Sequence, residues 1–243
     1  MGLFQEKKKL ILLCCAAELA MIAFIALACL FENFIYYLFY NLLYGLAVSV
    51  LLPLWVIAEK GEGLEEMGMK KLGGRQVLVL CAFCLFSVGG QVVPKLAAGE
   101  SLRWERLPVA VLPLMMTTFF EEFFFRGFVQ TRLERQFGSA AAVAASGLLF
   151  SLYHLGYPGF RSAGDLALLL AVGVGFALAF RLSGNNFFVS YFVNLPNAFL
   201  TYILKQEQFP HMTAQSTVWA GAAIAALAAV LLFFAKHRQA MRE

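Results

Sequence analysis

The sequence predicts an all-α fold, a polytopic membrane helical bundle of about eight transmembrane helices. Of the 243 residues, 61% are hydrophobic and only 14% are charged, whereas soluble domains carry about 25% charged residues. The apolar residues form continuous runs rather than alternating patterns, which is typical of spanning helices and not of a β-barrel. One membrane domain over residues 1–243 fits this length.

Eight apolar runs are long enough to be spanning helices. They cover about residues 10–31, 34–58, 77–93, 108–137, 139–155, 165–182, 187–204 and 218–235. A helix needs about 20 mostly apolar residues to cross the hydrocarbon core, and each run is close to that length. The connections between the runs are short, polar or rich in turn residues.

The first four spans are bounded by charges, glycines and prolines. Only Glu32 and Asn33 separate the first two, which predicts a tight helical hairpin. Residues 59–76 mix charges of both signs with glycines, and we expect them to form a solvated loop or a surface helix. The third span is expected to end at Pro94, and the fourth before Gly138.

The fifth and sixth spans are rich in small residues. The fifth contains residues 140–145 and Gly147, and the sixth contains Gly173 and Gly175. Small residues let two membrane helices approach closely, so we expect close packing at these glycines. A turn at residues 183–186 leads into the seventh span, and a polar link leads from there to the eighth.

Lysine and arginine are distributed unequally between the two sides of the predicted bundle. On the side of the N-terminus lie Lys7, Lys8, Lys9, Lys60, Lys70, Lys71, Arg75, Arg132, Arg135, Arg181, Lys236, Arg238 and Arg242. On the other side lie Lys95, Arg103, Arg106, Arg161 and Lys205. The positive-inside rule therefore predicts that both termini are cytoplasmic.

Composition also limits the partners that we expect. The net charge of +4 is modest and gives no reason to expect nucleic acid, whereas membrane lipid is a partner of every spanning helix. Cys81-x-x-Cys84 has the spacing of a metal or redox pair, but the chain has no second pair. We interpret these cysteines as small apolar residues within a helix.

The fourth span contains two adjacent carboxylates, Glu121 and Glu122, and Arg126 inside a nearly unbroken aromatic run. A charge at the centre of a membrane helix costs about 2.5–3.5 kcal/mol on insertion scales. Glu122 and Arg126 are four residues apart and can pair on one helix face. Glu121 is rotated by about 100° and is left for chemistry or metal binding. The alternative is a structural polar cluster that holds two helices together.

The chain has three histidines, and only His154 lies at the end of an apolar span. It follows Phe150 by four residues, so the two rings share a helix face. His154 is either a structural boundary residue or a base or metal ligand near the bilayer. His211 and His237 lie in polar segments and are most simply solvated. Glu18 lies inside the first span, and the sequence leaves open whether it faces a cavity or pairs with a distant arginine.

Asn194 and Asn197 share one face of the seventh span because they are three residues apart. They can bond across helices or satisfy the backbone groups freed by Pro196. They can also supply a carboxamide to a metal or to an oxyanion. A carboxylate, an imidazole and an asparagine face on different helices are what a site that activates water requires.

These motifs resemble those of a known family of intramembrane metalloproteases. Glu121-Glu122-x-x-x-Arg126, followed by Phe150-x-x-x-His154 on the next span, is similar to the first two motifs of the CAAX-prenyl endopeptidase and bacteriocin-processing family, also called Abi or CPBP proteins. The resemblance covers a core at about residues 113–200. It implies an integral protein of the bacterial inner membrane that acts on a membrane-associated protein or peptide.

The resemblance also implies roles for particular residues. Glu121 would activate water, and His154 would bind a metal or orient that water. The expected metal ligands are Glu121 and His154, and the expected ion is divalent, with zinc as the usual one. The family's third motif is His-x-x-x-Asn after a Gly-Asn turn; Gly184-Asn185 resembles that turn, and Asn197 matches the Asn and would support the oxyanion. Val193 stands where the motif has histidine.

Two other functions remain open from the sequence. The departure at Val193 favours a family member without catalysis, which would be a membrane scaffold or an immunity-type partner. A small transporter or channel could use the same polar cluster as a pathway, although no internal repeat supports it. In the catalytic interpretation Glu122, Arg126, Phe150 and Asn194 support the site.

Overall fold

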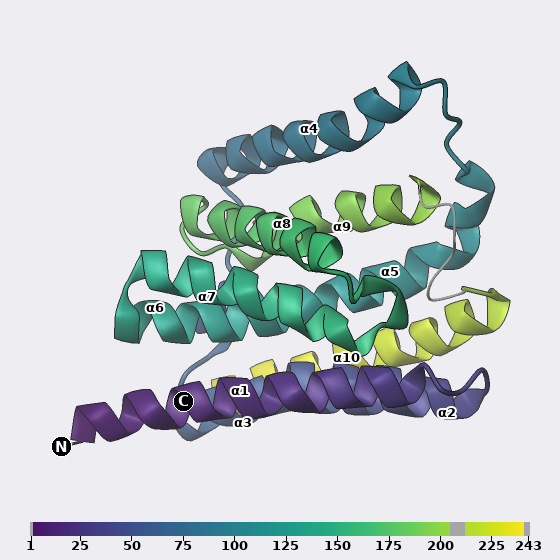
Figure 1. Cartoon of the computed structure of the whole chain (residues 1–243). Helices are drawn as coiled ribbons and strands as arrows, with labels where there is room; N and C mark the ends of the chain where they lie inside the picture. The colour runs from purple at the N-terminus through teal and green to yellow at the C-terminus, as the bar shows by residue number, and fades with distance from the viewer. Residues whose placement is uncertain (1, 205–211, 241–243) are drawn as a thin grey trace.

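The computed structural model describes residues 2–204 and 212–240, and the described residues form helices joined by turns and loops, without strands (Figure 1). It contains eight helices that are long and apolar enough to cross a membrane, so the predicted fold class is confirmed. The first crosses at Phe4–Ala28 and the last at Ala214–His237. Because the number of spans is even, both termini lie on the same side of the bundle.

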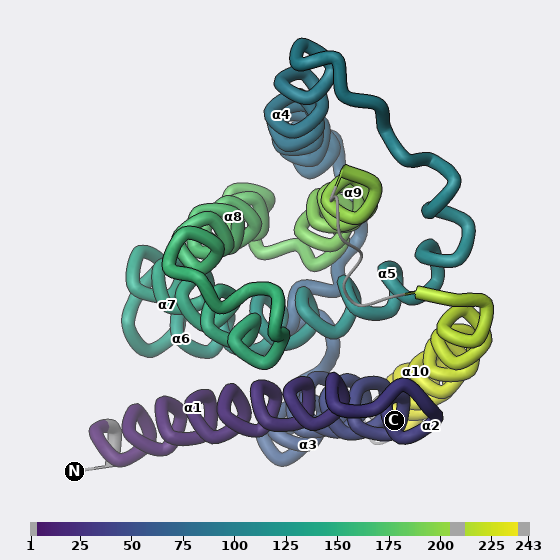
Figure 2. Tube along the Cα trace, turned by 45° about the vertical axis from the view of Figure 1, so that its right-hand side comes forward, coloured from purple at the N-terminus to yellow at the C-terminus, as the bar shows by residue number. Residues whose placement is uncertain are grey.

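The helices run side by side in several layers (Figures 1 and 2). On one side of the molecule lie α1 (Gly2–Ala28), the second span and α10 (Ala214–Ala240). The second span comprises α2 (Phe34–Tyr37), the π-helical η1 (Leu38–Leu51) and α3 (Leu52–Glu59). Asn33 caps α2 by accepting a hydrogen bond from the Ile35 amide at 2.9 Å, which gives the predicted tight hairpin its polar turn.

The fourth span is the central element of the bundle. It begins with η3 (Trp104–Arg106) and α5 (Leu107–Glu121), continues as the π-helical η4 (Glu122–Gln130) and ends in α6 (Thr131–Phe137). All nine residues of η4 are buried. Gly138, at φ +84°, ends the span as predicted. The π-helical segment is a departure from the expected regular helix, and such segments occur frequently at functional sites.

The remaining spans cover the other side of the central element. They are α7 (Ser139–Leu152) with the 3₁₀ turn η5 (Tyr153–Gly156), then α8 (Ala163–Leu182) and α9 (Phe187–Leu204), with the short η6 (Pro158–Phe160) between α7 and α8. Gly147 and Gly173 pack as predicted, because a Cβ at Gly173 would lie 2.9 Å from the Gly147 carbonyl oxygen. The expectation for Gly175 was wrong, since nothing lies within 4 Å of its Cβ position.

Helix α4 (Gly74–Ala97) lies at the edge of the bundle, against α9 (Figure 2). None of its residues is buried. The helix was expected to end at Pro94 but continues to Ala97. Pro94 has no backbone N–H and so removes one hydrogen bond within the helix, but α4 continues past it for one further turn.

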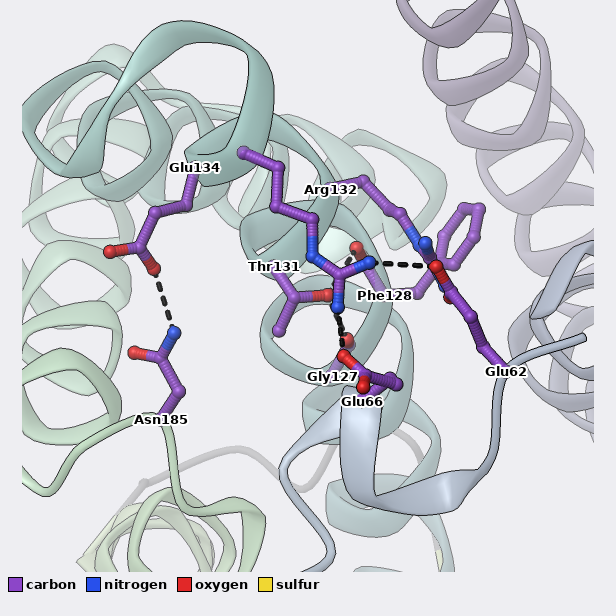
Figure 3. A network of polar contacts seen from close by, with 9 residues as sticks. Glu62, Glu66, Gly127, Phe128, Thr131, Arg132, Glu134 and Asn185 are labelled. Atoms are coloured by element: carbon purple, nitrogen blue, oxygen red, sulfur yellow. Dashed lines mark hydrogen bonds and ion pairs between the residues drawn. The ribbon is translucent and has the colours of Figure 1, made fainter. Parts of the chain in front are cut away.

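The connection that precedes α4 is held against the bundle by ion pairs (Figure 3). Around the 3₁₀ turn η2 (Leu64–Met67), Glu62 pairs with Arg132 and Arg135, and Glu66 pairs with Arg135. Partial burial of Glu62 would raise the pKa of its carboxyl, but the hydrogen bonds and charges of the two arginines outweigh burial and lower that pKa below 4.5. The segment that was expected to be a solvated loop or a surface helix thus contains a short 3₁₀ turn at its surface, and its ion pairs fix it before the start of α4.

Glu18 is buried on α1, with 4% of its surface exposed. Its carboxylate oxygens have no hydrogen-bond partner among residues 2–204 and 212–240. Glu18 does not line the main cavity, and the described arginines form no ion pair with it. In the described part of the chain Glu18 therefore neither pairs with an arginine nor faces the cavity that Glu121 lines.

Candidate active site

The predicted site residues lie around one cavity of about 560 Å³. Side chains from α4, α5, α7, α8 and α9 line it, together with residues of the α7–α8 connection. The lining includes Glu121, His154, Val193, Asn194 and Asn197. The fold therefore brings together residues from three predicted spans that are up to 76 positions apart in the sequence.

Glu121 lies at the junction of α5 and η4, and 8% of its surface is exposed. The Tyr153 hydroxyl donates a hydrogen bond to Oε1 of Glu121. The Asn194 amide nitrogen donates to Oε2 at 2.9 Å. Both carboxylate oxygens are thus held by neutral donors from two other spans, and the orientation of Glu121 toward the cavity is fixed.

Glu122 is turned away from the cavity toward Arg126, as the helix geometry predicted. Glu122 Oε2 and Arg126 Nε are 3.5 Å apart and both side chains are fully buried, which is an ion pair without hydrogen-bond geometry. Arg126 also donates to the Gly173 carbonyl oxygen at 3.0 Å. Its guanidinium carbon lies 4.6 Å from the centre of the Phe150 ring. Arg126 therefore ties η4 to α7 and α8.

His154 lies in η5, directly after α7, and 8% of its surface is exposed. Its Nδ1 is 2.8 Å from the Phe150 carbonyl oxygen. A carbonyl can only accept, so Nδ1 carries the hydrogen in this contact, and the lone pair of a neutral imidazole is then on Nε2. The Phe150 ring packs edge-on against the imidazole at 5.1 Å. The Phe150–His154 spacing thus fixes both the tautomer and the plane of His154.

The two asparagines of α9 have different environments. The Asn194 amide nitrogen bridges the carboxylates, because it also donates to Oε1 of Glu122 at 2.9 Å. The Asn197 amide oxygen faces α4 and accepts hydrogen bonds from Gln91 at 2.7 Å and Ser87 at 3.1 Å. Asn194 therefore contacts the glutamate pair directly, and Asn197 lies on another part of the cavity wall.

Several polar residues of the cavity were not singled out from the sequence. The Tyr40 hydroxyl is 2.7 Å from that of Tyr157 and 3.2 Å from that of Thr117, and all three residues line the cavity. Tyr153 precedes His154 directly in the sequence, and this adjacency was the one available signal. The others lie on distant spans, and only the fold shows that they converge.

The residues present do not fit a three-ligand zinc site. A catalytic zinc ion takes three protein ligands, and the described part of the chain contains no group of three His, Cys, Asp or Glu side chains that could hold an ion. Asn194 and Val193 supply no imidazole, and both oxygens of Glu121 already accept hydrogen bonds. His211 lies outside the described residues. Metal binding by Glu121 and His154 stays a prediction.

Comparison with known proteins finds a family model that matches the segment that carries the site. Residues 103–199 match the family model described as Type II CAAX prenyl endopeptidase Rce1-like. The comparisons with curated proteins and with solved structures gave no significant match. The matched residues include Glu121, Glu122, Arg126, His154, Asn194 and Asn197. The segment 103–199 of this membrane protein is therefore similar to the Rce1-like family of type II CAAX prenyl endopeptidases.

Proposed function

We propose that this protein is an intramembrane endopeptidase of the CAAX-protease type, which cleaves a membrane-associated protein or peptide. The observation that carries the proposal is the environment of Glu121. This carboxylate lines an apolar cavity and is oriented by Tyr153 and Asn194, whereas its neighbour Glu122 is used for the arginine pair. A carboxylate inside a membrane bundle is by default a functional site.

In this proposal Glu121 is the general base. It takes a proton from a water molecule, whose oxygen attacks the carbonyl carbon of the scissile peptide bond. When the carbon–nitrogen bond breaks, the same carboxyl group returns the proton to the leaving amine. The hydrogen bonds from Tyr153 and Asn194 hold the carboxylate in place during both transfers.

His154 and Asn197 would assist from the same cavity. His154 presents Nε2, since Nδ1 is used by the Phe150 carbonyl, and this nitrogen would orient the attacking water. The Asn197 oxygen is held by Gln91 and Ser87, so its two N–H donors are directed elsewhere. They would stabilise the negative charge that develops on the substrate carbonyl oxygen.

We further propose that both termini face the cytoplasm of a bacterial inner membrane. The proposal rests on the excess of lysine and arginine on the side that contains the termini. The structure has eight candidate spans. With eight spans, successive connections lie on alternate sides of the membrane, and the count of lysines and arginines assumed this alternation.

The non-catalytic alternative is supported by one specific observation. The Asn194 amide bridges both carboxylates, an arrangement that also suits a purely structural polar cluster across α5 and α9. In that case the chain would be a membrane scaffold or an immunity-type partner that keeps the family architecture without hydrolysis.

The two functions are separated by a hydrolysis assay with the purified protein. The substrate is a prenylated peptide that ends in Cys-aliphatic-aliphatic-X, incubated in water enriched in heavy oxygen. We expect the new carboxyl group of the product to contain one heavy oxygen atom. His154→Ala should abolish this product, and His237→Ala, at an exposed position of α10, should retain it. Absence of product from the folded native protein would favour the scaffold.

A further inference from the structure

Three basic residues are exposed around the start of α4. They are Lys70 and Lys71 in the connection before the helix and Arg75 in its first turn. The ion pairs found among residues 2–204 and 212–240 involve other lysines and arginines. Residues 70–75, which we call the basic segment, therefore present three cations without a counter-ion in the described part of the chain.

The acidic residues of the same connection do not neutralise the basic segment. Between α3 and α4 they are Glu62, Glu65 and Glu66. Glu62 and Glu66 pair with the arginines of α6 (Figure 3), and Glu65 is exposed and forms none of the ion pairs found in the described ranges. Negative charge is thus confined to the first half of the connection and positive charge to its end.

The backbone of the basic segment is fixed to the rest of the bundle. The side-chain amide of Asn186 donates hydrogen bonds to the carbonyl oxygens of Lys70 and Lys71, at 3.2 Å each. Just before the segment, the Gly68 carbonyl oxygen accepts a hydrogen bond from the Phe187 amide at 2.8 Å. The two lysines are therefore held at the start of α9 through their backbone, while their residues stay exposed.

The basic segment lies where the lipid-facing surface of α4 begins. Leu72 within the segment is 43% exposed, and Val77 and Leu78 in the next turns of α4 are 46% and 71% exposed. Helix α4 is one of the eight candidate spans, and its start lies at the end of the bundle that also contains the α6–α7 turn (Figure 1). Cations that adjoin an exposed apolar surface at the end of a span are at the level of the lipid headgroups.

We infer that Lys70, Lys71 and Arg75 form a binding site for the headgroup of an anionic phospholipid. Ammonium and guanidinium groups donate charge-assisted hydrogen bonds to phosphate oxygens, and basic residues next to a span attract anionic lipid. The acyl chains of the same lipid would lie against the exposed apolar side chains of α4, such as Leu78. A soluble anion lacks this second contact, so the pattern favours a lipid.

A lipid at this position would stabilise the part of the bundle that has the least support from protein. No residue of α4 is buried, and the helix packs mainly against α9. The same helix contributes Phe83, Ser87 and Gln91 to the lining of the active-site cavity. Because a ligand stabilises the arrangement to which it binds, the headgroup would help to keep this cavity wall in place. The lipid site itself does not rest on the proposed endopeptidase function.

The lipid preference can be measured by the quenching of a single tryptophan in the full-length chain. Trp55, Trp104 and Trp219 are replaced by phenylalanine, and Leu72→Trp places the reporter inside the basic segment. The protein is reconstituted into phosphatidylcholine bilayers with increasing fractions of either phosphatidylglycerol or phosphatidylcholine that has brominated acyl chains. A control chain keeps Trp219 as its single tryptophan, which is 39% exposed in a part of α10 without basic residues.

We expect Leu72→Trp to be half quenched at a fraction of brominated phosphatidylglycerol about fivefold lower than that of brominated phosphatidylcholine. Trp219 should be quenched equally by the two lipids. In the Leu72→Trp chain, Lys70→Gln combined with Lys71→Gln and Arg75→Gln should abolish the preference. Lys95→Gln should retain it, because that lysine is paired with Glu100.

Equal quenching of Leu72→Trp by the two lipids would overturn the inference. A preference that survives the triple change, or one of the same size at Trp219, would do so as well. If the triple variant does not fold, Lys70→Gln and Arg75→Gln are measured singly, and an undiminished preference in both would count against the site. Quenching does not use peptidase activity, so a chain that shows the preference but cleaves nothing would refute the endopeptidase and leave the lipid site unchanged.

Discussion

Two adjacent glutamates with different partners are the main feature of this molecule at the scale of residues. Glu122 faces Arg126 within the same span, so helix geometry alone could predict the pair. The partners of Glu121 come from η5 and α9, and no spacing in the sequence indicates that Tyr153 and Asn194 meet there. The sequence could therefore predict that Glu121 lacks the arginine, but not what holds it.

The position of Asn194 leads to a prediction about metal binding. Its amide nitrogen is 2.9 Å from both carboxylates, so an imidazole in its place would lie beside Glu121, whereas the histidine of the family motif corresponds to Val193. Because imidazole is a better zinc ligand than an amide, we expect Asn194→His to retain more zinc after dialysis than the native protein. Adding His154→Ala should remove the gain.

Zinc content measured by atomic spectroscopy, with Val193→His as the matched variant, checks this prediction. A native protein that keeps one zinc ion per chain would show that the missing ligand lies elsewhere. If Val193→His gains zinc and Asn194→His does not, the side chain of residue 193 must turn toward Glu121 when it is polar.

At the scale of elements, the contact between α7 and α8 supports the site from behind. Gly147 and Gly173 allow the two backbones to approach closely, and the Gly173 carbonyl accepts a hydrogen bond from Arg126. The small residues of the fifth span correctly predicted close packing. They could not show which of the two glycines on α8 faces α7, because Gly173 and Gly175 differ only in their rotation about the helix.

Gly173→Ala and Gly175→Ala are a matched pair for this contact. A Cβ at residue 173 would lie 2.8 Å from the Phe150 ring, and overpacking of this kind costs about 1–3 kcal/mol. At residue 175 the position is open, so alanine should be neutral or stabilise the helix by about 0.4–1 kcal/mol. Unfolding of both variants in detergent, followed by circular dichroism, should show this order. Equal stability would contradict the close approach of α7 and α8.

At the scale of the whole molecule, hydrophobicity predicted the number of spans and most of their limits. The seventh span was expected at 187–204 and is found at Phe187–Leu204. Hydrophobicity could not predict the π-helical η4, because its aromatic run suits a regular helix equally well. Hydrophobicity also could not predict that Glu62 pairs with Arg132 and Arg135 and so holds the segment before α4. These contacts join residues about 70 positions apart in the sequence.

The separate roles of Glu121 and Glu122 are the central claim. The most direct measurement compares Glu121→Gln with Glu122→Gln for two properties, the rate of peptide cleavage per folded molecule and the free energy of unfolding. We predict that Glu121→Gln lowers the cleavage rate about 10²-fold or more, because the base is lost, and leaves stability close to native. Glu122→Gln should lower stability by about 3–5 kcal/mol, because Arg126 is left buried without its partner, and Arg126→Met should restore much of that loss. Native cleavage by Glu121→Gln, or a loss of stability from Glu121→Gln with none from Glu122→Gln, would contradict the claim.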